Sequence, residues 1–242
     1  MRIAAVERDD RVKIGAGFAA GLVVAALVFC LFAPGPARPV FVTYLYWHLN
    51  PPRVGVQAGH AETYNAPDEL KALRGSIGAF QDDWGESIVN LDIARRVTAI
   101  LQRYGLAVDL LPTTIPPHYR ADAFVALHAD AWEDEKLSGF KVTRGDWSIS
   151  TLRDDTLVAD LVSEYAAGTG LPEHRASISD NMMQYYAFNY KRFEHAVDPS
   201  TPAAIMEMGF LTNDGDRQLL REQPDRVATA IAMGILKFLE TR

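Results

Sequence analysis

Three strand-like segments of the sequence each carry a histidine or a glutamate near their carboxyl ends. The segments are RVGVQAGH, AFVALHAD and AAIMEMGF, and the residues are His60, His128 and Glu207. In an open α/β sheet, ligands bind at the rim formed by the carboxyl ends of the strands, so we expect these side chains to converge there. Glu86 opens the helical pattern that follows the first segment, and it should lie near the same rim.

This set of residue types suits a catalytic zinc ion. Two histidines and one carboxylate form a three-ligand set that leaves the fourth position for water or substrate. The other carboxylate can take the proton from that water, whose pKa the metal lowers toward about 7. Glu207 stands between Met206 and Met208, and an unpaired buried carboxylate costs several kcal/mol. Its charge therefore either reaches solvent at the strand end or has a chemical role.

Each of the four residues also has an ordinary structural explanation. His60 follows a glycine, as a loop histidine can, His128 can simply end a strand, and Glu86 is stabilised at a helix N-terminus by roughly 0.3–1 kcal/mol. Taken one at a time, these explanations are preferable for every residue except Glu207, but together they require four coincidences. The remaining histidines stand in linker or loop contexts and are assigned no role: His48, His118, His174 and His195.

Strand-like and helix-like patterns alternate from Arg53 onward and predict the elements that position these residues. We expect strands at 53–60, 107–112, 123–130 and 203–208, the last followed by a glycine turn, and helices at 86–105, 155–168 and 225–240. Apolar strands separated by helices indicate a three-layer α/β domain with a mostly parallel twisted sheet flanked by helices. The first helix should bury the apolar stripe formed by Ile88, Leu91, Ala94, Val97, Leu101 and Tyr104.

The composition is that of an ordinary globular protein and excludes several classes. The 242 residues are 48% hydrophobic and 23% charged, which suffices for one well-buried domain. The net charge of -7, without a dense run of Lys or Arg, excludes a basic footprint for nucleic acid. The single cysteine, Cys30, excludes both an intrachain disulfide framework and a cysteine-based zinc site.

The N-terminal segment 14–33 contains 20 residues without a charge, about the length of a membrane-spanning helix. Four basic residues precede it, so the positive-inside rule predicts a cytoplasmic tail at 1–13, a single-pass anchor at 14–33, a linker at 34–52 and an extracytoplasmic domain at 53–242. A cleaved signal peptide is the competing interpretation. The aromatic piece VFVTYLYWHL within the linker is either a lead strand or an interfacial segment.

Several motifs resemble the zinc-dependent N-acetylmuramoyl-L-alanine amidases with an Amidase_3 type catalytic domain. The resemblance covers about Val54 to Leu239 and is carried by VGVQAGH, GESIVNLDIARRV, ADAFVALHADA, PAAIMEMGFLTNDGDRQLL and VATAIAMGILKFL. It implies that His60, Glu86 and His128 bind one Zn²⁺ and that Glu207 is the catalytic base. It also implies that the substrate is peptidoglycan and that the bond cleaved joins N-acetylmuramic acid to L-Ala. An extracytoplasmic domain agrees with that substrate.

The sequence departs from the family pattern in two loops. The segment 61–85 is longer than usual, and LLPTTIPPHYR replaces a longer stretch before His128. Glu62 and Asp68 are alternative carboxylates near His60, although their spacing makes them less suitable ligands than Glu86. The aromatic residues of NMMQYYAFNY either line a groove or pack in the core.

Three alternatives are weighed beside this function, and the altered loops motivate the first of them. The first is a zinc hydrolase that acts on another amide, and the second is a non-catalytic peptidoglycan-binding or division-associated module. The third is an active enzyme that the loop 61–85 holds shut. The sequence indicates neither a protein partner nor an oligomeric state.

Overall fold

The computed structural model describes residues 50–240. The predicted tail and anchor, and nearly all of the predicted linker, lie outside these residues. Within residues 50–240, no helix combines the length and the apolar character needed to cross a membrane. A compact unit begins at Pro52.

The centre of this unit is a five-stranded sheet in the order β4-β1-β5-β7-β6. Four strands are parallel to one another: β1 (Arg53–Ala58), β4 (Ala107–Leu111), β5 (Ala123–Asp130) and β7 (Ala203–Phe210). The edge strand β6 (Lys141–Thr143) pairs antiparallel with β7. The prediction of a mostly parallel sheet is therefore confirmed.

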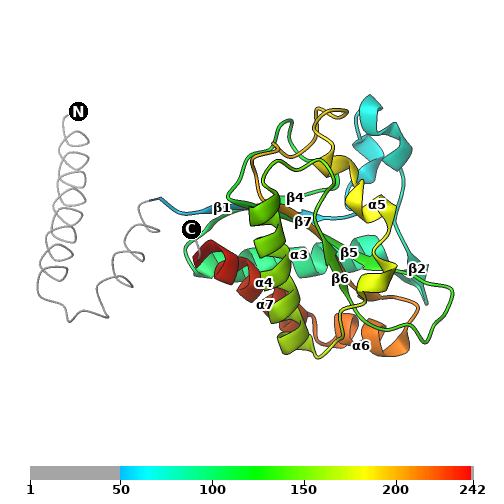
Figure 1. The fold of residues 1–242 in the computed structure, drawn as a ribbon. Helices are drawn as coiled ribbons and strands as arrows, with labels where there is room; N and C mark the ends of the chain where they lie inside the picture. Colours follow the sequence, from blue (N-terminus) through cyan, green and yellow to red (C-terminus); the bar gives the residue numbers. More distant parts are fainter. Residues whose placement is uncertain (1–49, 241–242) are drawn as a thin grey trace, which may run out of the picture. The chain divides into compact units, whose positions relative to one another are not determined.

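Three long helices form one layer against this sheet (Figure 1). They are α3 (Glu86–Arg103), α4 (Thr151–Thr169) and α7 (Pro224–Glu240). Helix α3 packs on β4, β1 and β5, helix α4 packs on β7 and β6, and α7 contacts both helices. The short helix α6 (Asp214–Glu222) follows β7 and packs against α7. All three predicted helices are present.

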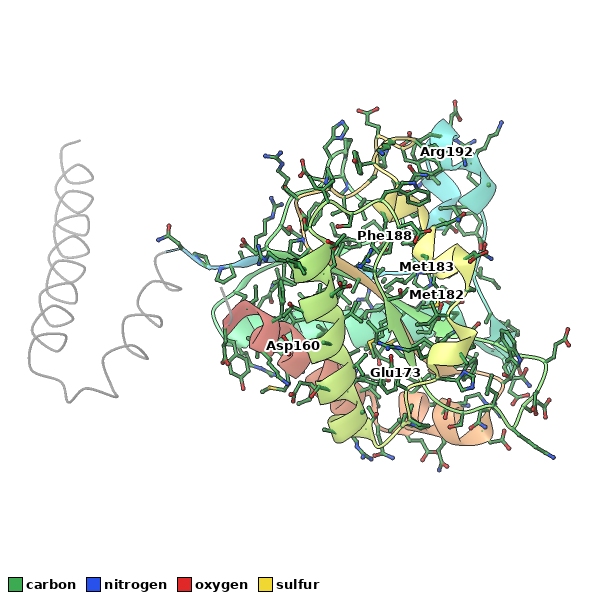
Figure 2. The ribbon with its side chains drawn as sticks, in the orientation of Figure 1. Asp160, Glu173, Met182, Met183, Phe188 and Arg192 are labelled. Atoms are coloured by element: carbon green, nitrogen blue, oxygen red, sulfur yellow. The ribbon has the colours of Figure 1, made fainter. Side chains whose placement is uncertain are left out.

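Short helices and loops cover the opposite face of the sheet. They include four 3-10 helices and one short α-helix: η1 (Thr63–Asn65), η2 (Asp68–Leu73), η3 (Arg175–Ser177), α5 (Asp180–Met183) and η4 (Tyr186–Phe188). Met182 and Phe188 belong to this cover (Figure 2). They join Phe124 and Ile205 of the sheet in one apolar cluster. Side chains alternate along a strand, so His128 and Glu207 lie on this same face.

The structure corrects several details of the prediction. Strand β7 continues through Gly209 to Phe210 without a turn. In α3 the buried stripe is displaced, so that Val89 and Ile93 are buried while Ile88 and Tyr104 are 58% and 55% exposed. The hydrophobic pattern of the sequence did not predict β6 or the hairpin formed by β2 (Phe80–Gln81) and β3 (Trp84–Gly85). Strands of two or three residues are too short to show a periodicity.

Candidate metal centre and active site

The structure brings His60, Glu86 and His128 together at the carboxyl rim of the sheet. One donor atom from each residue lies within 4.8 Å of the other two. Glu86 Oε1 is 3.6 Å from His60 Nε2 and 2.9 Å from His128 Nδ1. Two ligand atoms on a tetrahedral zinc ion are about 3.3 Å apart. The three side chains therefore fit the spacing and the donor chemistry of a zinc site with an open position.

Each of these residues comes from a different element. His60 follows β1 and has a φ of 61°, a left-handed conformation that costs a non-glycine residue roughly 1–3 kcal/mol and is often found at functional sites. Glu86 is the first residue of α3, and His128 lies within β5. The glycine before His60 is needed for close packing, because a Cβ atom on Gly59 would lie only 2.7 Å from His128 Cδ2.

Neighbouring groups hold the three side chains in this arrangement. Asn90 donates from Nδ2 to Glu86 Oε1 at 3.1 Å and to the Gly59 carbonyl at 3.0 Å. The Ala79 amide donates to Glu86 Oε2 at 2.8 Å. Ser76 Oγ is 3.0 Å from His60 Nδ1, which directs Nε2 toward Glu86. Such partners orient metal ligands and are a usual part of metal sites.

The backbone of residues 76–79 passes directly against the candidate ligands. Gly78 has a φ of 74°, and a Cβ atom there would collide with the Glu86 carboxylate and the His60 ring. This stretch belongs to the long loop 61–85. Part of the loop therefore supports His60 and Glu86 instead of forming a separate surface feature.

Glu207 lies beside His128 on the same face of the sheet. The two are register partners on the neighbouring strands β7 and β5. Glu207 is partly buried, and within residues 50–240 its Oε2 atom and His128 Nε2 are buried without a hydrogen-bond partner. Both atoms are therefore free to interact with a ligand at the rim. The expected placement of Glu207 near the ligand set agrees with this register.

The two glutamates differ in their affinity for a proton. Burial raises the pKa of Glu207 to about 8, and the negative charges of Glu86 and Asp130 act in the same direction, while His128 and Lys141 oppose them. Burial also acts to raise the pKa of Glu86, but the hydrogen bond from His128 and the charges of both histidines outweigh it and lower that pKa to about 2. One carboxylate is thus suited to bind a cation and the other to accept a proton.

The pKa values of the two histidines are also shifted in opposite directions. Burial lowers the pKa of His60, which favours the neutral form that binds metals. Burial acts to lower the pKa of His128 as well, but the hydrogen bond to Glu86 and the nearby carboxylates raise it overall. His128 therefore holds a proton more strongly than an ordinary histidine, and a bound cation would compete with that proton.

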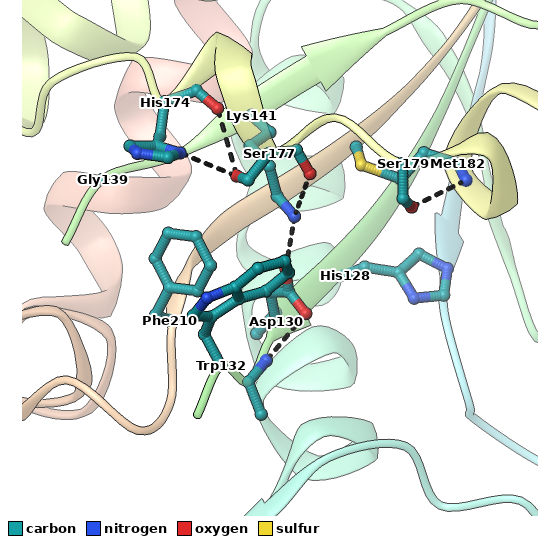
Figure 3. Close-up of polar contacts among 12 residues, drawn as sticks. His128, Asp130, Trp132, Gly139, Lys141, His174, Ser177, Ser179, Met182 and Phe210 are labelled. Atoms are coloured by element: carbon teal, nitrogen blue, oxygen red, sulfur yellow. Dashed lines mark hydrogen bonds and ion pairs between the residues drawn. The ribbon is translucent and has the colours of Figure 1, made fainter. Parts of the chain in front are cut away.

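Lys141 extends the row formed by His128 and Glu207 on the adjacent strands. Its place there could not be expected from the sequence. It is the register partner of Glu207 on β6 and is 2% exposed. Its ammonium group forms an ion pair with Asp130 and donates to the Ser177 carbonyl at 3.3 Å (Figure 3). A positive charge thus flanks Glu207 on the side opposite His128.

The aromatic segment NMMQYYAFNY before β7 packs in the core and also reaches the candidate site. Tyr186 and Phe188 are buried in the apolar cluster. Tyr185 is partly buried, and its ring meets the His128 ring edge-on at 5.3 Å between centroids. The Tyr185 hydroxyl donates to Gln57 Oε1 at 3.1 Å. This side chain therefore connects the core to the candidate site.

Among the described residues, none of the other titratable residues considered above joins the cluster. Glu62 is exposed, and Asp68 pairs with Arg74 at 2.6 Å on the surface. His195 contacts Glu69, and His174 contacts Ser177. His118 is exposed in a loop, and His48 lies outside the described residues.

The mostly parallel sheet and the His/Glu/His cluster at its carboxyl rim define the class of protein. It is an α/β domain with a site suited to metal-dependent chemistry. Residues 54–237 match the family described as N-acetylmuramoyl-L-alanine amidase. The chain belongs to this family, whose members hydrolyse the amide between N-acetylmuramic acid and L-Ala of peptidoglycan.

Individual relatives agree with this assignment. N-acetylmuramoyl-L-alanine amidase AmiA of Salmonella typhimurium is 26% identical over a 200-residue alignment that covers 63% of this chain and 68% of that protein. The amidase Ami1 of Mycobacterium smegmatis superposes with a TM-score of 0.59 at 19% identity, over 79% of this chain and 98% of that one. AmiC2 of Nostoc punctiforme gives a TM-score of 0.54 at 23% identity, over 78% and 97% of the respective chains. These two structures share the fold.

Proposed function

We propose that this chain hydrolyses the N-acetylmuramoyl-L-alanine amide of peptidoglycan at a single zinc site held by His60, Glu86 and His128, with Glu207 as the general base. The observation that carries the proposal is the convergence of the three donor atoms within 4.8 Å, beside a carboxylate with a raised pKa. When bound, zinc would polarise the scissile carbonyl and make a water molecule a better nucleophile near neutral pH.

The residues around the site have separate tasks in this reaction. Glu207, ionised beside the cation, accepts the proton of the attacking water and then passes it to the leaving amine of L-Ala. Lys141 keeps a positive charge next to Glu207 and thereby favours its ionised form. Ser76 and Asn90 hold the imidazole and the carboxylate that would bind the metal.

The proposal has a direct test with the full chain in detergent. We expect one zinc ion per chain and release of peptides from muramoyl-peptides. Glu207→Gln should keep the zinc and lower kcat by about 10²- to 10⁴-fold, the usual contribution of a general base. Asp68→Asn is a matched control, because Asp68 is a surface carboxylate with a 96% exposed side chain. A fully active Glu207→Gln variant would remove the assigned role.

Analysis of products from intact peptidoglycan separates this activity from the alternatives. New L-Ala amino termini without new reducing ends are the expected result. New amino termini of another kind would indicate another amide substrate. Bound zinc without turnover of any muramoyl-peptide would favour a non-catalytic wall-binding module.

We further propose that the segment 14–33 anchors the chain in the cytoplasmic membrane with the domain outside. The support is the 20-residue stretch without a charge, preceded by basic residues, and the location of peptidoglycan outside the membrane. Lys136 is exposed in the domain. A membrane-impermeant thiol reagent should therefore label Lys136→Cys in intact cells, and labelling only after lysis would contradict the topology.

A further inference from the structure

A groove with a volume of about 520 Å³ begins at the candidate metal ligand His60 and runs beside helix α3. One wall is the outward face of the helix, which includes Ile88 and Arg95. The other wall comes from the loop after β1, which includes Glu62 and Tyr64, and from Ile77. We call this surface the α3 groove. It is continuous with the site, because His60 belongs to both.

The α3 groove exposes several large apolar side chains. Ile88 is 58% exposed, Ile77 is 45% exposed and Tyr64 is 76% exposed. The sequence pattern placed Ile88 on the buried face of α3, and the structure turns it into the groove. Apolar side chains gathered in a concave surface next to a reactive site are typical of a substrate-binding surface.

Arg95 places an uncompensated positive charge at the far end of the groove. No residue between 50 and 240 forms an ion pair or hydrogen bond with its guanidinium group, which is exposed. Asp92, also in the groove, is already paired with Arg96 at 3.0 Å. The remaining acidic residue, Glu62, lies in the loop near His60. The distal end therefore favours an anion, and a guanidinium group suits a carboxylate.

The distance along α3 from the metal site to Arg95 matches a short peptide. Glu86 and Arg95 are nine residues apart on α3, which corresponds to about 13 Å at 1.5 Å per residue. An extended peptide advances about 3.3 Å per residue, so a chain that starts at the metal site reaches Arg95 after about four residues. The stem peptide of the proposed substrate starts at the scissile amide and carries carboxylates along its length.

We propose that the α3 groove binds the peptide part of the substrate and that Arg95 binds a carboxylate beyond its second residue. This inference rests on the proposed function, because it places the scissile amide at the metal site. The apolar residues Ile88 and Tyr64 contact the aliphatic parts of the peptide, and Arg95 makes the cleavage selective for an anionic stem.

The test uses the full chain and two probes. One is a muramoyl-tetrapeptide with free carboxylates on its third and fourth residues, and the other is the same compound with those groups converted to carboxamides. We expect the unaltered chain to show a KM for the carboxamide that is higher by about five- to tenfold, the effect of one charge-assisted contact at a partly solvated site. Arg95→Gln should raise the KM of the free-acid probe by the same factor, leave kcat within about twofold and abolish the discrimination. Arg95→Lys should restore part of it.

Arg103→Gln is the matched control, since Arg103 is exposed on the same helix but does not line the groove. It should behave like the unaltered chain. Equal KM values for the two probes with the unaltered chain would overturn the inference while leaving the proposed function intact. A loss of kcat in Arg95→Gln, or an equal rise in KM for both probes, would also overturn it. Turnover of neither probe by the unaltered chain would refute the proposed function itself, and the inference with it.

Discussion

Substitution of Gly78 by alanine should disrupt the metal site although it replaces none of the candidate ligands. A Cβ atom at this position would lie 2.7 Å from Glu86 Cδ and 2.8 Å from His60 Cδ2. Ordinary carbon contacts begin near 3.5 Å, so the Glu86 carboxylate and the His60 ring must each move by at least about 0.7 Å. Zinc-ligand distances tolerate deviations of only about 0.2 Å. The substitution should therefore weaken zinc binding by at least about 100-fold, more than the usual 10- to 100-fold effect of an outer-shell change.

Gly75 provides a matched control for this experiment. Its φ of 73° is nearly the same as that of Gly78, so alanine at either position incurs a similar left-handed backbone cost of about 1–2 kcal/mol. A Cβ atom on Gly75 would meet only Tyr64, at 3.9 Å. The difference between the two variants therefore isolates the collision with the ligands.

The measurement is the zinc dissociation constant by chelator competition, followed by kcat/KM at saturating zinc. We expect Gly75→Ala to bind zinc almost as tightly as the unaltered chain and Gly78→Ala to lose both binding and activity. Equal zinc affinity in the two variants would refute the reasoning, because it would show that residues 76–79 do not lie against Glu86 and His60.

Three further predictions concern the groups around the site. Ser76→Ala should weaken zinc binding by about 10- to 100-fold in the same competition assay, because His60 loses the partner of its Nδ1 atom; unchanged affinity would contradict that role. Lys141→Met should lower the free energy of unfolding by about 2–3 kcal/mol in urea denaturation. This is less than for a fully buried pair, because the Asp130 side chain is 24% exposed. An unchanged urea midpoint would contradict this prediction. In the zinc-free protein the pKa of Glu207 is raised from 4.5 to about 8, so the folded state binds the extra proton between these values and stability falls as the pH rises through this window. Glu207→Gln should therefore raise Tm more at pH 8.5 than at pH 5 in the presence of a chelator, and an equal shift at both values would contradict the burial of this carboxylate.

The positions of the candidate ligands could be expected from the sequence because they follow from simple rules. Apolar segments that lack polar alternation predict parallel strands, and the carboxyl ends of such strands share one rim. Glu86 could be placed because its helix has a clear start. The pairing of β5 with β7, which places His128 beside Glu207, is known only from the structure.

The groups that support these residues could not be expected, because their signals are weak. Ser76 and the Ala79 amide act from an irregular loop, and hydrogen bonds from such a backbone leave no pattern in the sequence. Lys141 occupies a strand of three residues, where a buried lysine resembles a surface one. The predicted buried face of α3 differs from the observed one because Ile88 suits either a core or a binding surface. Only the packing of Val89 and Ile93 decides between these two positions.

The most direct test of the central claim is a crystal structure of the zinc-loaded chain, with the ion located by its anomalous scattering. The account predicts one zinc ion bound to the imidazoles of His60 and His128 and to the Glu86 carboxylate, each at about 2.0–2.2 Å. The Glu207 carboxylate should face the open position without binding the metal. Zinc bound directly by Glu207, or an ion located away from His60, Glu86 and His128, would contradict it.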